Sequence, residues 1–215
     1  MRRLTKEERR RSILAAAARA FATRTFAGTT TADIAREANV SEPILYRHFA
    51  SKRELYLACV EEDWSRLREA IEAEVANEPD PAEWPLVAAR SVRRLQERRA
   101  LLPYFWIQAL GEAAGDPVIR RHMRRHAREV HAFLRDLIAR SQAAGGVPED
   151  LDPDAEAWIT IGIGLLRAAG SRLGGLPGPR DFDAIASARR RALAGTDGAS
   201  RMRGAPAAAP GPPLR

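Results

Sequence analysis

The side chains with the most evident chemical use are gathered between Ser41 and Lys52. A helix that begins after Ser41 puts Leu45 and Phe49, which are four residues apart, on one apolar and therefore buried side. Its opposite face carries Pro43, Ile44 and Arg47. An arginine can donate two hydrogen bonds to a guanine edge, and an apolar side chain can contact a thymine methyl group. That face therefore predicts base recognition in the major groove of DNA.

Polar side chains flank this face and predict contacts with the DNA backbone. Tyr46 and His48 lie on its two sides, and Lys52 adds a cation just past the helix. Glu42 has two interpretations: it can accept a hydrogen bond from a cytosine amine, or it can complement the positive end of the helix dipole. The expected DNA contacts are Thr30, Thr31, Ser41, Glu42, Pro43, Ile44, Tyr46, Arg47, His48 and Lys52.

A second short helix must hold this one in place. It can begin after Thr29 or Thr30, because a threonine oxygen can accept hydrogen bonds from the first N–H groups of a helix. Asn39 stands where the chain must reverse and tolerates the left-handed conformation that such a turn needs. Ser41 is a suitable N-cap for the helix that follows. Together these features predict a helix-turn-helix motif, and the alternative is a surface helix in an ordinary bundle.

The excess positive charge lies in the same part of the sequence. The 215 residues include 35 Lys and Arg against 28 Asp and Glu, which gives a net charge of +7. Residues 1–53 hold 12 of the basic and 5 of the acidic residues, so the rest of the chain is balanced. A basic domain indicates a polyanionic partner such as DNA. Arg9, Arg10 and Arg11 are either further phosphate contacts or a solvated helix face.

The motif resembles that of a known family. Over Leu4–Leu57 the sequence is similar to the N-terminal signature of the TetR family of bacterial transcriptional regulators, at Thr30–Thr31, Asp33–Ala35, Val40–Ser41, Leu45–Tyr46, His48–Phe49 and Lys52. It departs from the family at Thr25 and Asn39, where Gly is usual. We expect Asn39 to adopt a positive φ, and the β-branched Thr25 to follow a different local path.

Hydrophobic periodicity predicts an all-α protein of about nine helices. Beyond the motif, helices are expected at Leu4–Thr23, Ser51–Asn77, Pro85–Arg99, Leu101–Ala114 with an interruption at Pro103, Pro117–Ala144, Asp152–Leu173 and Asp181–Leu193. We expect a three-helix DNA-binding domain over residues 1–53, and a ligand-binding and dimerisation domain over residues 54–194. Residues 195–215, rich in Ala, Pro and Gly, are expected to be disordered.

The resemblance implies a small-molecule site in the second domain. The candidates are Trp84, Tyr104, Phe105, Trp106, Met123 and Trp158, each of which can instead be a plain core residue. No cluster of charges converges in this part of the chain, which favours a mainly apolar ligand. A ligand that prefers another shape of the domain would move the helix Ser51–Asn77 and change the spacing of two DNA-binding heads.

The stretch Trp158–Leu166 is apolar nearly all round, which predicts burial on every side, with one surface against another subunit. The expected dimer interface comprises Ile161, Gly162, Leu165, Phe182, Ile185 and Leu193. The resemblance implies a four-helix bundle formed by two subunits. Such a homodimer would place two recognition helices about 34–36 Å apart on a palindromic operator.

We expect no enzymatic activity, cofactor or metal. The sequence has no Gly-rich phosphate loop, GxSxG or HExxH. His122 and His126 have a spacing that can bind a metal, but no cysteine or clear carboxylate partner completes a site. Cys59 is the single cysteine, which excludes an intrachain disulfide. No run reaches the ~18 apolar residues of a membrane span and no signal peptide is evident, so a cytoplasmic protein is expected.

Three functions stay open. The first is a homodimeric repressor that a small, mainly apolar ligand releases from a palindromic operator. The second is an activator or ligand-independent regulator of the same family. The third is a helical interaction protein with only nonspecific affinity for DNA. Sequence-selective DNA binding distinguishes the third function from the other two.

Overall fold

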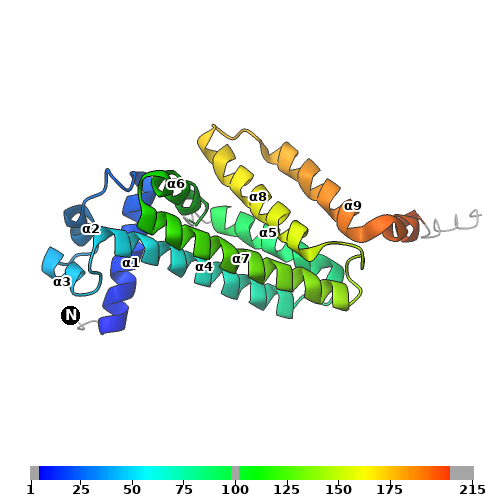
Figure 1. Ribbon diagram of the computed structural model, residues 1–215, viewed down its shortest axis with the longest axis horizontal. Coiled ribbons are helices and arrows are strands. Elements are labelled where there is room, and N and C mark those ends of the chain that lie inside the picture. Colours follow the sequence, from blue (N-terminus) through cyan, green and yellow to red (C-terminus); the bar gives the residue numbers. More distant parts are fainter. Residues whose placement is uncertain (1–4, 98–101, 204–215) are drawn as a thin grey trace, which may run out of the picture.

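The computed structural model describes residues 5–97 and 102–203, and over these residues the chain is helical, without strands, as predicted (Figure 1). Its α-helices are α1 (Lys6–Thr23), α2 (Thr31–Glu37), α3 (Glu42–Tyr46), α4 (Lys52–Ala76), α5 (Trp84–Glu97), α6 (Leu102–Gly115), α7 (Pro117–Ala143), α8 (Pro153–Arg172) and α9 (Pro179–Arg203). The expected number of about nine helices is confirmed for the described part of the chain.

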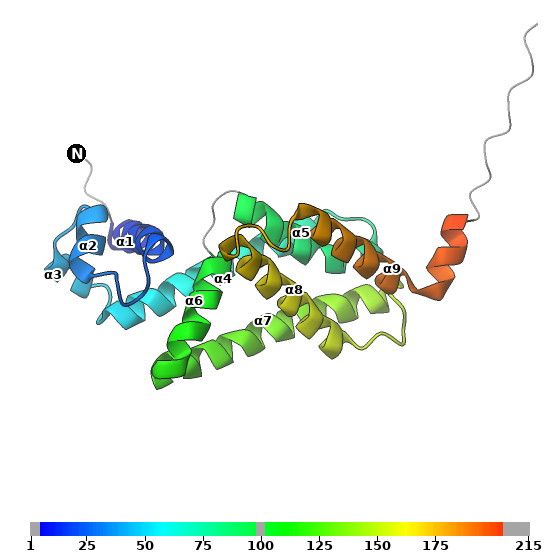
Figure 2. The ribbon, with the colours of Figure 1, turned by 90° about the horizontal axis from the view of Figure 1, so that it is seen from above.

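The helices form a small head and a larger body. Figures 1 and 2 show α1–α3 grouped at one end of an elongated molecule, and α4 running from this head into the body. We call α1–α3 the head and α5–α9 the body. Helix α4 packs on α1 in the head and on α5, α6 and α7 in the body. It is therefore one element through which a change in the body can reach the head.

Capping residues set where the helices begin. Thr5 and Glu8 form the capping box expected for α1. Asp116 and Asp152 accept hydrogen bonds from the first N–H groups of α7 and α8. Pro103 was expected to interrupt α6. It lies instead in the first turn of that helix, where its missing N–H has no partner to lose.

The turn between α2 and α3 confirms the expectation for Asn39, which has φ of 54°. Thr25 is not among the described residues with positive φ, so the different local path expected for it is also confirmed. Its hydroxyl accepts a hydrogen bond from the N–H of Gly28, at 3.0 Å. That bond closes the loop between α1 and α2 without a left-handed residue.

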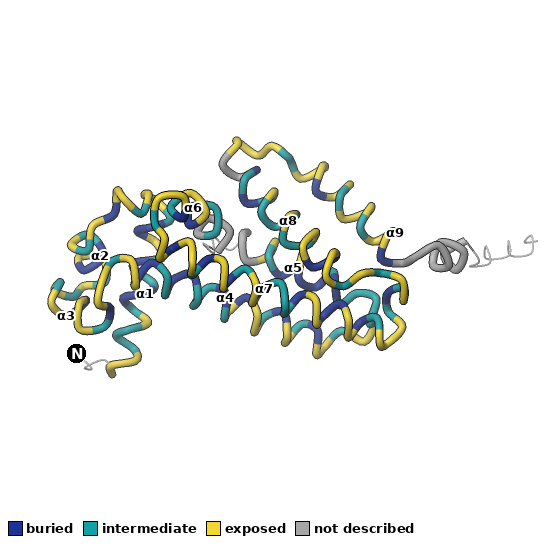
Figure 3. The backbone as a smooth tube through the Cα atoms, in the orientation of Figure 1, coloured by how far each residue is buried: buried dark blue, intermediate teal, exposed yellow. Residues whose placement is uncertain are grey.

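One hydrophobic core joins the head to the body. Ile13 and Phe21 of α1, with Leu45 of α3, form its centre in the head. The same core continues through α4 into α6 and α7, and its further members are Leu55, Tyr56, Cys59, Val60, Ala109, Ala113, Ile119 and Met123. A second core fills the body among α4, α5, α7 and α8. Figure 3 shows the buried residues of α4 along most of its length.

One expectation about the C-terminal part needs correction. Helix α9 continues to Arg203, so residues 195–203 are helical rather than disordered, while residues 204–215 lie outside the described residues. On α8, Trp158, Ile159 and Leu166 are 51%, 42% and 41% exposed in this chain, and their burial against another subunit stays a prediction. Among the described residues, no helix has the length and apolarity required to cross a membrane.

Candidate nucleic-acid interface and ligand cavity

Helix α3 presents the face that the sequence predicts. Leu45 and Phe49 are buried at 0% and 1% exposure, which fixes α3 and the turn after it on the head. Pro43 and Arg47 are exposed and Ile44 is half-buried, so all three lie on the side away from the core. The structure thus leaves one guanidinium and two apolar side chains on the outer side of a short helix, a chemistry suited to base edges.

The two helices of the motif are tied together through Thr31 of α2. Its hydroxyl donates to Glu42 Oε2 at 2.7 Å and lies 3.2 Å from the hydroxyl of Tyr46. Because the Thr31 proton goes to Glu42, Tyr46 must be the donor in the second contact. Glu42 therefore has a partner within the protein, which favours a positioning role over the reading of cytosine.

Tyr46 and Ser41 have exposed side chains with hydroxyls that can donate to a phosphate. Tyr46 is 47% exposed, and its O–H can turn from Thr31 to a phosphate oxygen. Ser41 is the N-cap residue of α3, but its side chain makes no capping hydrogen bond. It is exposed on the same side of the motif. Both residues fit the predicted contacts with the DNA backbone.

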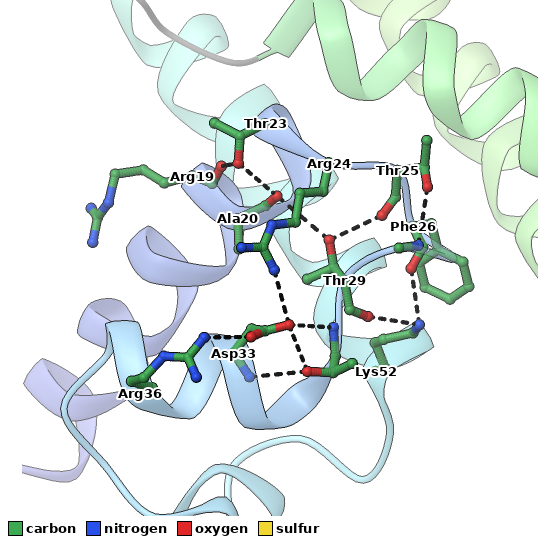
Figure 4. Close-up of polar contacts among 12 residues, drawn as sticks. Arg19, Ala20, Thr23, Arg24, Thr25, Phe26, Thr29, Asp33, Arg36 and Lys52 are labelled. Carbon is green, nitrogen blue, oxygen red and sulfur yellow. Dashed lines mark hydrogen bonds and ion pairs between the residues drawn. The ribbon is translucent and has the colours of Figure 1, made fainter.

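Lys52, which was predicted to contact a phosphate, donates two hydrogen bonds within the protein. Its ammonium donates to the carbonyl oxygens of Phe26 and Thr29, each at 2.9 Å, and lies 4.5 Å from the centre of the Phe26 ring (Figure 4). Lys52 is half-buried. The sequence showed a cation beside the motif but not the two carbonyls that the preceding loop turns toward it. Lys52 therefore links the start of α4 to the α1–α2 loop.

Asp33 holds the first turn of α2 in place through several polar contacts (Figure 4). It accepts hydrogen bonds from the N–H and hydroxyl of Thr30, the latter at 2.7 Å, and forms ion pairs with Arg24 and Arg36. The hydrogen bonds from Thr30, in the first place, hold the pKa of Asp33 below its usual range. Thr30 is thereby engaged as the N-cap of α2, and only a change of partner would bring its hydroxyl to DNA.

His48 lies half-buried among cations. Burial lowers the pKa of its imidazole, and the charges of Lys6, Arg10 and Arg47 lower it further. The guanidinium of Arg10 is stacked 4.3 Å from the centre of the Phe49 ring, which keeps it on this side of the head. A neutral imidazole can still donate one hydrogen bond to a phosphate, and an adjacent phosphate would favour its protonation.

A cavity of about 170 Å³ lies inside the body. Its walls come from α4, α5, α7, α8 and α9, and Trp106 of α6 closes one side. Most of the lining is apolar, including Leu67, Val92, Leu134 and Ile138. The cavity thus lies against α4, the helix that enters the head.

Of the predicted ligand contacts, the structure places one on this cavity. Trp106 lines it, whereas Met123 is buried in the core between head and body. Trp84 packs at the edge of the second core and donates its indole N–H to the carbonyl of Glu78 at 3.0 Å. Trp158 is half exposed and stacks on His131 at 4.4 Å. The side chains of Tyr104 and Phe105 lie outside the described residues.

The predicted dimer contacts lie mostly on the cavity wall, which includes five of them: Ile161, Leu165, Phe182, Ile185 and Leu193. Phe182 and Leu193 are buried within this chain, and the part of these residues in a dimer stays a prediction. Of the predicted set, Gly162 is exposed. Periodicity identified two apolar helices correctly but could not show which of their faces looks inward.

The cavity also holds charged groups that the sequence analysis missed. Arg189 of α9 forms an ion pair with Glu156 of α8, and both side chains are largely buried. The guanidinium of Arg167 lies 3.9 Å from the centre of the Phe182 ring. In each pair the two residues belong to different helices, so no spacing rule within one helix could reveal the contact. They place charged groups at two separate points of the cavity wall, because Glu156 and Arg167 are eleven residues apart on α8.

A second polar cluster joins α4 to α7. Glu61 Oε1 lies 2.7 Å from His122 Nε2 and 3.5 Å from His126 Nδ1. These two histidines hold the pKa of Glu61 well below its usual range, His122 being the larger influence. The sequence analysis found no carboxylate partner for the histidine pair, and this was wrong. Glu61 is supplied by another helix, so the spacing within α7 could not reveal it.

Sequence comparisons agree with this architecture. A model of the family described as "Bacterial regulatory proteins, tetR family" matches residues 13–59, and one described as "BetI-type transcriptional repressor, C-terminal" matches residues 86–163. The HTH-type transcriptional activator FasR of Mycolicibacterium smegmatis is 46% identical over 59 residues. The chain spans about a quarter of the length of FasR, since the match covers 27% of each protein.

Solved structures share the fold over most of the chain. AibR, in complex with isovaleryl coenzyme A and operator DNA, has a TM-score of 0.59 at 24% identity, with 75% of this chain and 86% of AibR covered. FadR from Bacillus subtilis, in complex with stearoyl-CoA, has a TM-score of 0.70 at 16% identity, with 86% and 97% covered. Members of this family are DNA-binding regulators rather than enzymes. With both parts of the chain matched by models of one family, and with its fold, the protein belongs to the TetR family of bacterial transcriptional regulators.

Proposed function

We propose that the protein is a cytoplasmic, homodimeric repressor that a small, mainly apolar ligand releases from a palindromic operator. Residues 1–53 bind DNA, and residues 54–194 bind the ligand and form the dimer. The observation that carries the proposal is the position of α4. This helix begins at Lys52, shortly after α3 ends at Tyr46, packs on α1 of the head, and contributes Trp64, Leu67 and Ile71 to the cavity wall.

The DNA contacts follow from the surface of the motif. Arg47 reads a base, Ile44 and Pro43 lie against neighbouring bases, and Tyr46 anchors a phosphate. Lys52 and Glu42 hold the motif together instead of touching DNA. This assignment rests on exposure for the first group and on hydrogen bonds within the head for the second.

The dimer surface is the outer side of α8. Trp158, Ile159 and Leu166 are large apolar side chains that this chain leaves exposed, and burial of such side chains against a second copy is favourable. Leu166→Arg should convert the dimer into a monomer in light-scattering measurements. Arg47→Ala, far from α8, is the control and should stay dimeric.

The ligand is an acyl group with an acidic or thioester-linked head. The apolar wall suits an acyl chain, and the guanidinium of Arg167 on the same wall suits a polar head group. AibR and FadR were solved with acyl coenzyme A molecules. A cavity of about 150 Å³ accommodates benzene, so one of about 170 Å³ favours a short branched chain of the isovaleryl kind over stearoyl unless α9 moves outward.

The test has two stages. Bound sequences are first selected from random duplex DNA with the purified protein at about 150 mM salt, where nonspecific binding is weak. A palindrome supports the dimeric DNA reader. The absence of a motif would instead favour the helical interaction protein.

The selected duplex is then labelled and titrated with isovaleryl-CoA, stearoyl-CoA and free CoA. Release by isovaleryl-CoA but not by CoA supports the repressor. Tighter binding with ligand, or no response to any of the three, would favour an activator or a ligand-independent regulator. Ala88→Leu, which adds volume at the cavity wall, should bind DNA normally and respond less to ligand.

A further inference from the structure

Three atoms of metal-ligand type lie between α4 and α7 without a hydrogen-bond partner. They are Glu61 Oε1, His122 Nε2 and His126 Nδ1, and each is shielded from solvent. His126 is completely buried. Buried polar atoms are nearly always paired, and exceptions are where a water or an ion is expected. The cluster therefore needs a further occupant.

These groups do not satisfy one another, although they are close. His122 Nε2 lies 2.7 Å from Glu61 Oε1, yet the direction of its ring nitrogen does not form a hydrogen bond with that oxygen. His126 Nδ1, at 3.5 Å from the same oxygen, also fails to form one. Ligand atoms that are close but not directed at one another are the arrangement expected around a metal ion.

We propose that Glu61, His126 and Glu129 hold a divalent transition-metal ion between α4 and α7. One ligand atom from each of the three lies within 4.8 Å of the other two. Two carboxylates and an imidazole suit Zn²⁺, and Ni²⁺ is the nearest alternative. His122, which touches the same oxygen of Glu61 from the other side, is available as a fourth ligand. The proposal does not depend on the acyl ligand.

The hydrogen bond from Trp106 to His126 competes with metal binding. The indole N–H of Trp106 donates to His126 Nε2 at 3.0 Å, so in the metal-free ring the proton lies on Nδ1, toward Glu61. A metal at Nδ1 takes the place of that proton, and the neutral ring then carries its proton on Nε2, facing the N–H of Trp106. Two donors face each other, so metal binding and the Trp106 hydrogen bond exclude one another.

The position of Trp106 connects this site to the cavity. Trp106 lines the cavity, and Glu61 lies on the helix that enters the head. A ligand that turns Trp106 away from His126 would favour the metal, and by linkage the metal would favour that ligand. The ion would also fasten α4 to α7.

The test is calorimetric titration of the metal-free full chain with Zn²⁺. We expect one ion per chain, and affinity that falls as the pH is lowered, because protons compete for the ligands. Glu129→Gln should weaken binding at least about tenfold, since even outer-shell changes reach that size. Its side chain is half exposed, so folding should be unaffected. His131→Gln, at a histidine that stacks on Trp158, is the control and should bind normally.

Trp106→Phe gives the sharpest result. It removes the opposing N–H and keeps an aromatic ring, so Zn²⁺ should bind about two- to tenfold more tightly, the equivalent of one hydrogen bond. A generic surface site would not respond to this change. Absence of stoichiometric binding to the wild type, or wild-type affinity in both Glu129→Gln and Glu61→Gln, would overturn the proposal and leave a buried water between the helices. Either result leaves the acyl-responsive repressor untouched.

Discussion

Arg53 of α4 and Asp116 of the α6–α7 loop form an ion pair, with Arg53 Nε 2.7 Å from Asp116 Oδ2. The other oxygen of Asp116 accepts hydrogen bonds from Val118 and Ile119 and caps α7. One carboxylate thus joins the first turn of α4, next to the head, to the first turn of α7. The head is fastened to the body by this polar contact as well as by the shared core.

Removal of the ion pair should have a small effect on the stability of the protein. Arg53→Gln and Asp116→Asn should each lower Tm by about 1–3 °C, because exposed ion pairs contribute little in a chain of this size. Asp116→Ala should lower it further, since the helix cap is also lost. Differential scanning calorimetry measures all three. Equal values for the two Asp116 variants would show that the cap has no effect.

Substitutions of Arg47 and Tyr46 should affect DNA binding in different ways. Arg47→Ala should cost about 1–3 kcal/mol at one base position and relax selectivity there. Tyr46→Phe removes only the hydroxyl and should weaken all sequences alike, because a phosphate contact carries no base information. Binding measurements on a panel of single-base variants of the selected operator compare them. A Tyr46→Phe protein that lost selectivity at one position would refute the backbone role.

Lys52→Met should behave as a stability variant. It leaves the carbonyls of Phe26 and Thr29 without their donor, and loss of such charge-assisted bonds should lower the free energy of unfolding by about 2 kcal/mol. The slope of DNA affinity against salt should stay the same. Lys6→Met, at the other lysine of the chain, is the control for stability. A salt slope lower by about one would restore Lys52 to the DNA contacts.

Asp63 should make the protein more stable in mild acid. Burial raises the pKa of its carboxyl to about 6, from an ordinary value of 3.8, and Oδ2 has no hydrogen-bond partner. Its proton is bound more tightly in the folded state, so stability should rise as the pH falls from about 6 to about 4. Asp63→Asn should remove this dependence and add about 1–2 kcal/mol at pH 8. Urea unfolding at several pH values measures both; an unchanged pH profile would contradict it.

DNA binding itself should strengthen as the pH falls, through His48. Burial and the neighbouring cations lower the pKa of this imidazole in the free protein, and an adjacent phosphate would raise it. The bound state then takes up a proton, so affinity increases toward acid pH. His48→Gln should remove this pH dependence of the DNA affinity, as measured by fluorescence anisotropy.

Local patterns predicted the fold well because they are read within one helix. The Thr5–Glu8 capping box, the reversal at Asn39 and the buried pair Leu45 and Phe49 all depend on neighbours a few residues away. The recognition face of α3 followed from the same periodicity.

The site residues that were missed depend on contacts between helices. The sequence showed Lys52 as a cation beside the motif, but not that the carbonyls of Thr29 and Phe26, 23 and 26 residues earlier, accept hydrogen bonds from it. Phe182 and Leu193 looked like interface residues, because an apolar stripe does not tell whether it faces its own chain or a partner. Glu61 lies on a different helix from His126, so no spacing rule could pair them.

The continuous core of head and body has a consequence for engineering. Hybrid regulators are made by joining the DNA reader of one relative to the sensor of another. In this chain a cut at residue 53 would strip Leu55, Tyr56 and Val60 from the packing that supports α1 and α3. A workable junction therefore lies past Val60 within α4. The relative that supplies the head must also supply the matching ends of α6 and α7, so that the core beneath α1 and α3 is kept intact.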